Sequence, residues 1–201
     1  MKNIVEKAKQ VHQDNVDKGF WDGKTPESRT VECLALIHGE VSEALEAHRK
    51  NRWANLEQFK IDQKSWKDNF INHFKTSFEN HIKDTVEDEL ADTAIRVLDL
   101  IGALDMNELV IDIFNGKHET EFHNVEFSYI VNELHNEIVF LSDRLEIRRD
   151  SGKDKEVIYA FDTLISMFYG IGKYYNIDLE KHIDLKLEYN KLRAYKHGKT
   201  Y

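Results

Sequence analysis

Two pairs of carboxylates stand one helical turn apart in this chain of 201 residues. Glu40 and Glu43 form the first pair, and Glu89 and Asp92 form the second. Residues three apart lie on the same face of a helix, so each pair presents its two carboxylates together. Carboxylate oxygens are the ligands that Mg²⁺ and Mn²⁺ prefer, and Mg²⁺ commonly keeps positions open for water and substrate phosphates. The two pairs therefore predict an all-oxygen metal site between two helices.

The first pair is the more informative one, because it interrupts an apolar stripe. On a helix, Glu40 and Glu43 share a face with Cys33, Leu36 and Ala47. Two carboxylates in an apolar stripe lose hydration and repel each other unless a cation lies between them. The second pair continues along its face into further charged residues, which is also typical of an exposed helix face. On its own, that pair leaves both interpretations open.

The elements that would position these carboxylates are helices. With one Pro and nine Gly, the chain has too few turn-forming residues for a strand-rich domain. Apolar residues recur at helical spacing along most of it, so we expect an all-α fold. We expect a helix to begin at a cap at Thr25-Pro26 and the chain to turn at 115–117. The expected helices cover 2–17, 25–51, 85–103, 125–149, 154–175 and 178–196.

Part of this helical order occurs twice. Residues 91–109 align without a gap with residues 161–179, and several identities, including an Asp-Thr pair, recur. Tyr159 stands in the second copy where the first has Glu89, so the acidic motif there is weakened. One interpretation is an internal duplication that gives two unequal halves. The other is that apolar helices resemble each other by composition alone.

A duplication would organise the chain as one domain, 1–201, with a chemically active half and a supporting half. The catalytic half would cover about 1–110 and contain an insertion at about 52–85, which is rich in Lys, Asn, Phe and Trp. A degenerate repeat half would cover about 120–180. A basic C-terminal helix, at about 178–196, would follow it.

Composition limits the class of partner. The formal net charge of −9 argues against a protein that grips nucleic-acid polymers, whose footprint is basic. The single cysteine, Cys33, forms no internal disulfide and suits the reducing cytoplasm. The first residues are too polar for a signal peptide, and no apolar run approaches the length of a membrane span. We therefore expect a cytoplasmic protein that binds neither nucleic acid nor membrane.

Three blocks of sequence, in order, resemble one enzyme family. The blocks are LIHGEVSEALEA at 36–47, EDELAD at 87–92, and KLEYNKLR at 186–193 followed by HGK at 197–199. They are similar to the ExxE and ExxD motifs and to the tail of the all-α NTP pyrophosphohydrolases, particularly the MazG-like branch. The resemblance covers roughly half of the chain. The weakened second half also gives a looser similarity to the dimeric dUTPases.

This resemblance implies a MazG-like helical bundle that hydrolyses a nucleoside or deoxynucleoside triphosphate to the monophosphate and pyrophosphate. It implies that Glu40, Glu43, Glu89 and Asp92 bind Mg²⁺, or Mn²⁺ as a substitute, and form the catalytic centre. It also implies a homodimer or an internal pseudo-dimer. The longer link at 52–85 departs from the family pattern, so no base-recognition loop carries over, and dUTPase-like or dCTPase-like specificity stays open.

The last expected helix carries candidate substrate ligands on one face, namely Lys186, Tyr189, Asn190 and Arg193. Lys and Arg bind triphosphates through charge, and Arg does so in bidentate fashion. The alternative is a basic C-terminal turn favoured by the helix dipole.

Two further residues are candidates for substrate contacts. Trp21, in a Gly-flanked break, either stacks on the base or packs against the bundle. Arg96 either neutralises Asp92 or Asp99 or contacts a phosphate. The whole chain also has a non-catalytic interpretation, as a helical interaction protein descended from an enzyme of this kind.

Overall fold

The computed structural model describes residues 4–65, 70–104, 120–151 and 154–198, and every regular element within these ranges is helical. The all-α prediction is therefore confirmed. The expected turn at 115–117 lies outside the described residues. No helix in the described ranges is long and apolar enough to cross a membrane. The helices are α1 (Ile4–Asp17), α2 (Pro26–Arg49), α3 (Leu56–Ser65), α4 (Phe70–His81), α5 (Val86–Ala103), α7 (Phe127–Ser151), α8 (Asp154–Tyr175) and α9 (Leu179–Lys191), followed by the 3₁₀ turn η1 (Tyr195–Gly198).

Threonine caps fix where the two carboxylate-bearing helices begin. Thr25 accepts the backbone N–H of Ser28 at 3.2 Å, and Pro26 takes the first position of α2 as predicted. Thr85 accepts the N–H of Asp88 at 3.3 Å and starts α5. The cap places three acidic residues in the first turn of α5, where the helix dipole favours negative charge.

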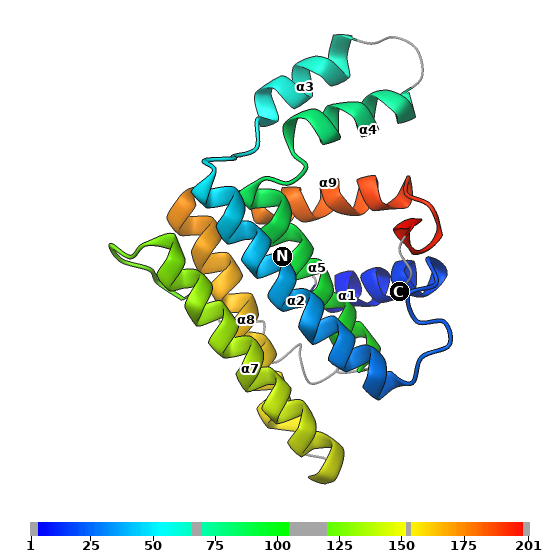
Figure 1. The fold of residues 1–201 in the computed structure, drawn as a ribbon, viewed down its shortest axis with the longest axis vertical. Helices are drawn as coiled ribbons and strands as arrows, with labels where there is room; N and C mark the ends of the chain where they lie inside the picture. Colours follow the sequence, from blue (N-terminus) through cyan, green and yellow to red (C-terminus); the bar gives the residue numbers. More distant parts are fainter. Residues whose placement is uncertain (1–3, 66–69, 105–119, 152–153, 199–201) are drawn as a thin grey trace.

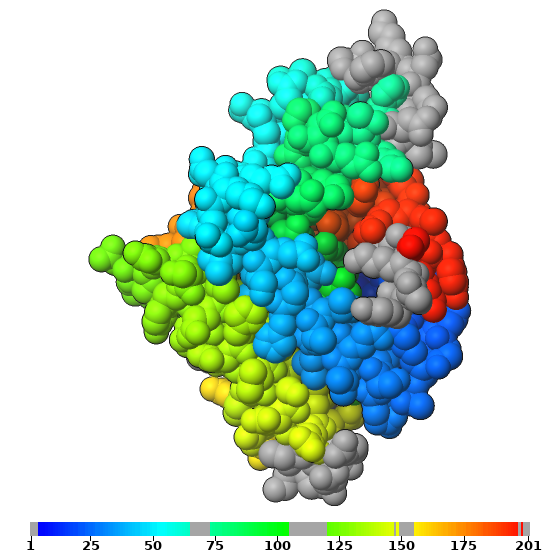
Figure 2. Space-filling model, viewed as in Figure 1, coloured from blue at the N-terminus to red at the C-terminus, as the bar shows by residue number. Residues whose placement is uncertain are grey.

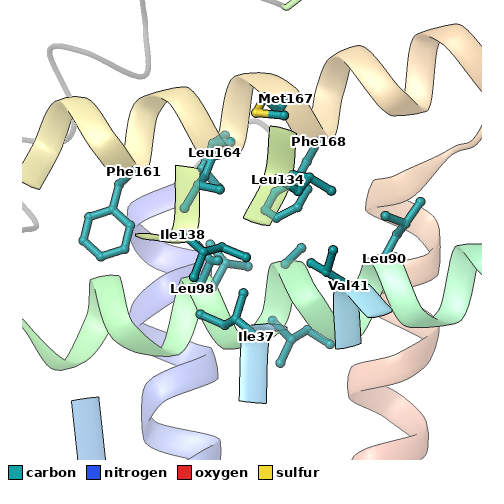
Figure 3. Packing of buried hydrophobic residues seen from close by; sticks show 14 of the residues in the cluster. Ile37, Val41, Leu90, Leu98, Leu134, Ile138, Phe161, Leu164, Met167 and Phe168 are labelled. Atoms are coloured by element: carbon teal, nitrogen blue, oxygen red, sulfur yellow. The ribbon is translucent and has the colours of Figure 1, made fainter. Parts of the chain in front are cut away.

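Helix α5 runs through the middle of the bundle (Figure 1). It packs against α1, α2 and α9, and it also contacts α8, while α7 packs against both α2 and α8. Figure 3 shows side chains from α2, α5, α7 and α8 converging on one apolar core. Because α5 is covered on several sides, its buried residues extend from Val86 to Ile101 on nearly every face. Glu89 and Asp92 therefore lie on a helix that is buried along most of its length.

Helices α3 and α4 form an arm that projects from one end of the bundle (Figures 1 and 2). A small aromatic core holds the arm to α9, and its members are Phe59, Phe74, Phe78, Ile82 and Tyr189. The ring of Tyr189 stacks on Phe78 with centroids 4.4 Å apart. The insertion expected at 52–85 is thus a pair of helices with a core of its own.

The two aligned stretches of sequence begin in α5 and α8, and residues 105–109 of the first stretch lie outside the described residues. The threonine of the shared Asp-Thr pair makes the same contact in both: Thr93 Oγ1 donates to the Glu89 carbonyl at 2.8 Å, and Thr163 Oγ1 donates to the Tyr159 carbonyl at 3.0 Å. Such bonds to the carbonyl four residues back are common for threonine in helices. The duplication itself stays a prediction.

Candidate metal centre and adjoining cleft

A cleft of about 610 Å³ lies between α1, α2, α5 and α9. It brings together all four carboxylates of the two sequence pairs and four of the six predicted substrate ligands. The residues that line it are Asn15, Phe20, Arg29, Leu36, Glu40, Glu43, Lys83, Asp84, Glu89, Asp92, Ile95, Arg96, Lys186, Asn190 and Arg193.

Three of the four carboxylates converge inside this cleft. Glu40, Glu89 and Asp92 each offer one oxygen, and these oxygens lie within 4.8 Å of one another. Glu40 comes from α2, whereas the other two come from α5. Only 8% of Glu40 and 5% of Glu89 are exposed, so the exposed-face interpretation of the second pair is wrong for Glu89. The convergence therefore places oxygens from two helices within reach of one ion.

Glu43 has a different position from its predicted partner. It lines the cleft, but its side chain is exposed and it stands outside the group of three converging oxygens. The sequence argument ranked Glu40 and Glu43 as the stronger pair. The structure instead makes Glu89 the deepest member, because α5 is more enclosed than this part of α2.

Arg96 binds Glu40, a partner that the sequence analysis did not consider for it. Arg96 Nη2 lies 2.5 Å and Nε 2.7 Å from the same oxygen, Oε1. Burial raises the pKa of Glu40, and the Arg96 guanidinium opposes that rise. Asp99, a predicted alternative partner of Arg96, instead accepts from Trp21 Nε1 at 3.2 Å and lies 2.9 Å from His12 Nδ1.

Lys186 is buried between two carboxylates. Its Nζ lies 2.7 Å from Asp92 Oδ2 and 2.8 Å from Asp88 Oδ2. Burial alone would lower the pKa of Lys186, but Asp92 and Asp88 raise it, so the ammonium stays charged. Asp88 was missed as a site residue, although its spacing of four from Asp92 places both on one helix face. Lys186 therefore fixes the carboxylates of α5 to α9.

Glu89 is a buried carboxylate of the cleft whose charge is only partly offset, by the Lys186 ammonium. Among the residues that the structure describes, none donates a hydrogen bond to its side chain or forms an ion pair with it. Burial, together with the Asp88 and Asp92 carboxylates, raises the pKa of Glu89 to about 9. A divalent cation in contact with this oxygen would offset both causes and favour the ionised form. The residues present therefore fit a hard cation.

The C-terminal segment folds back over α1 instead of continuing as a helix. The helix expected at 178–196 ends at Lys191, and this expected boundary was wrong. Lys18 Nζ donates to the carbonyls of Lys191 and Arg193 at 3.0 and 2.6 Å, so the end of α9 is tied to the end of α1. The Tyr195 ring occupies the space that a Cβ on Gly19 would need. These contacts hold the C-terminal residues beside the N-terminal helix (Figure 2), with Arg193 in the lining of the cleft.

The two aromatic candidates lie outside the set of residues that line the cleft. Tyr189 is 5% exposed, stacks on Phe78 and donates to Glu79 Oε1 at 2.9 Å. Trp21 bonds Asp99, as described above, which is the packing alternative stated for it. Its neighbour Phe20 lines the cleft instead, and the sequence carried that signal as an aromatic pair in the same break.

No protein-family model, curated protein or solved structure matches this chain.

Proposed function

We propose that this protein is a Mg²⁺-dependent hydrolase that converts a nucleoside or deoxynucleoside triphosphate to the monophosphate and pyrophosphate, on a MazG-like bundle. The observation that carries the proposal is the convergence of Glu40, Glu89 and Asp92 inside a cleft that also contains cationic side chains. The order of the sequence motifs supports it independently.

The donor set suits Mg²⁺. Carboxylates alone converge here, and hard oxygen ligands favour Mg²⁺ and Mn²⁺ over Zn²⁺. Glu40, Glu89 and Asp92 would hold the ion, with Glu43 at the exposed side of the same cleft. A bound divalent ion would neutralise phosphate oxygens and activate water.

The chain's own cations and apolar residues would place the substrate. Arg193 and Lys83 line the cleft and would pair with phosphate oxygens. Arg96 holds Glu40, so its role is to position that carboxylate. Phe20, Leu36 and Ile95 supply the apolar part of the lining, against which a base would pack.

A nucleotide panel tests the activity. Purified protein with Mg²⁺ should release pyrophosphate and a monophosphate from at least one common NTP or dNTP, with dUTP and dCTP included. Both products should be identified, because release of inorganic phosphate alone would indicate another reaction. Absence of pyrophosphate release across the panel, with Mg²⁺ and with Mn²⁺, would contradict the proposal.

A non-catalytic helical interaction protein is the second candidate, and the ion pairs favour it. Lys186 and Arg96 already neutralise Asp92 and Glu40, as buried structural pairs do. Titration with Mn²⁺ separates the two candidates. The double variant Glu40→Gln/Glu43→Gln should bind Mn²⁺ far more weakly than the wild type if the site is a metal centre. Equal binding would favour the interaction protein.

A further inference from the structure

The α3–α4 arm reaches the last helix of the bundle through one aromatic ring. Helix α4 lies against α9 (Figure 1). Phe78, near the end of α4, is fully buried, and its ring stacks on that of Tyr189 with centroids 4.4 Å and planes 12° apart. The Tyr189 hydroxyl donates to Glu79 Oε1, again on α4, at 2.9 Å. An apolar contact and a polar contact therefore fix the arm on α9 at the same place.

The Phe78 ring also lies beside the ammonium of Lys186. The Nζ atom is 5.7 Å from the ring centroid, a distance at which the face of an aromatic ring attracts a cation. Lys186 precedes Tyr189 by three positions, so both side chains lie on the face of α9 that meets the arm. Only 4% of Lys186 is exposed, so little water competes with the ring for the ammonium. Phe78 therefore limits the positions that the Lys186 ammonium can take.

Lys186 in turn orients a carboxylate of the candidate metal centre. Its Nζ lies 2.7 Å from Asp92 Oδ2, and it donates to the two oxygens of Asp88 at 2.9 and 2.8 Å. Asp92 belongs to the group of three residues whose oxygens converge in the cleft, whereas Asp88 lies outside that group. Carboxylates that hold a metal ion are commonly oriented by hydrogen bonds of this kind, and their partners influence affinity for the ion. The ammonium thus links the aromatic ring to a metal-binding oxygen.

Both connections of the arm are tied close to this centre. Where the chain leaves the arm, the Phe78 carbonyl accepts the backbone N–H groups of Ile82 and Lys83, each at 2.9 Å, and Lys83 then lines the cleft. Where the chain enters the arm, the N–H of Ala54 donates to Glu87 Oε2 at 2.9 Å, in the first turn of α5. The core of the arm therefore has a fixed place relative to the helix that carries Asp92.

We propose that Phe78 is a positioning residue of the metal centre, and that it orients Asp92 through Lys186. Phe78 is not among the described residues that line the cleft, so it acts only through the ammonium that it covers. The arm, which lengthens the link between the two carboxylate pairs, thereby sets the affinity for the ion. The inference rests on the metal centre of the proposed function, and it does not require the hydrolytic step itself.

The test compares two buried aromatic residues of the arm by Mn²⁺ titration of the full chain, followed by electron paramagnetic resonance. Phe78→Leu keeps an apolar side chain but removes the ring face, and it should weaken Mn²⁺ binding about tenfold. The matched control is Phe74→Leu, because Phe74 is 3% exposed in the same core and its described ring contacts are with Phe59 and Phe78. Since this variant leaves the Lys186 ammonium covered, it should change Mn²⁺ affinity less than about twofold.

A spectroscopic signature separates positioning from loss of stability. Both variants should unfold at lower urea concentration, because each removes buried atoms. The NMR signal of the Lys186 ammonium, assigned with Lys186→Met, should move in Phe78→Leu and keep its place in Phe74→Leu. Equal weakening of Mn²⁺ binding by both variants would assign the effect to the stability of the arm and overturn the inference.

Two further variants complete the test. Glu89→Gln is the reference for the site itself: unchanged Mn²⁺ binding in that variant would contradict the metal centre and this inference with it. Weaker binding in Glu89→Gln together with unchanged binding in Phe78→Leu would refute the positioning role alone. Should Phe78→Leu fail to fold, Tyr189→Leu removes the ring that supports Phe78 from α9, and it carries the same expectation.

Discussion

Helices α5 and α8 carry aligned stretches of sequence but give their acidic faces different surroundings. On α5, Glu89 is 5% exposed, and one of its oxygens lies within 4.8 Å of oxygens of Asp92 and Glu40. On α8, the matching position is Tyr159, which is 61% exposed. The difference follows from position, because α1, α2 and α9 all pack on α5, whereas α8 packs mainly on α7. The position on α5 therefore has both a carboxylate and the burial that raises its pKa, and the matching position on α8 has neither.

The ion pairs of α5 and α8 should differ most in their contribution to the free energy of unfolding. Lys186→Met leaves Asp88 buried without its cation and should lower the free energy of unfolding by about 3–5 kcal/mol. Lys173→Met, on α8, removes a lysine that is 63% exposed and lies 4.0 Å from Glu121, and should cost less than about 1 kcal/mol. Urea denaturation measures both. Similar losses would show that the burial of Lys186 does not set its contribution.

Metal affinity should next distinguish the carboxylate of α5 from one on α7. Glu89→Gln removes the buried negative charge and one carboxylate oxygen, and it should weaken Mn²⁺ binding by at least about 100-fold. Its matched control is Glu137→Gln on α7, a half-buried carboxylate beside Glu133 whose pKa is raised by burial. The control should change Mn²⁺ affinity less than about twofold. If both variants bind equally, the metal is not held where the three oxygens converge.

Two glycines at equivalent places test how closely each helix is packed. A Cβ on Gly102 of α5 would lie 2.5 Å from the Ala8 carbonyl oxygen, whereas one on Gly172 of α8 would meet the Ile177 carbonyl at 3.0 Å. Gly102→Ala should therefore destabilise the protein by about 1–3 kcal/mol through overpacking against α1. Gly172→Ala should cost less, and calorimetric melting compares them. A larger loss of stability for Gly172→Ala than for Gly102→Ala would contradict the inference that α5 is more tightly packed at this place than α8.

Stability should also depend on pH through Glu89. Its pKa rises from 4.5, the ordinary value of a glutamate side chain, to about 9 on folding, so between these values the folded protein binds the proton that the unfolded chain releases. In chelator, unfolding free energy should therefore fall as pH rises, by at most about 1.4 kcal/mol per unit. Glu89→Gln should flatten this slope, and Glu137→Gln should flatten it less. Identical slopes in the wild type and Glu89→Gln would contradict the raised pKa.

Much of the fold was readable from the sequence because its signals are local. The Thr25-Pro26 cap and the helical period of the apolar residues predicted limits for α2 and α5 that the structure confirms within a few residues. Chain reversal after Lys191 was not predicted, because it depends on Lys18 and Gly19 at the other end of the sequence. Local sequence signals therefore predicted where the helices lie, whereas contacts with residues distant in sequence determine where α9 ends.

The candidate site was likewise predictable from the sequence only in part. Spacing within an apolar stripe nominated Glu40 and Glu43, because a helix places residues three apart on one face. Glu89 and Asp92 were nominated by the same spacing together with the family resemblance. Spacing did not show that Glu43 stays exposed, or that Arg96 and Lys186 bind carboxylates instead of standing free. Those contacts join helices that are far apart in the sequence, so no local pattern contains them. The sequence determined which residues could hold a cation, and the packing of α5 between α2 and α9 decided which carboxylate is buried without an ion pair.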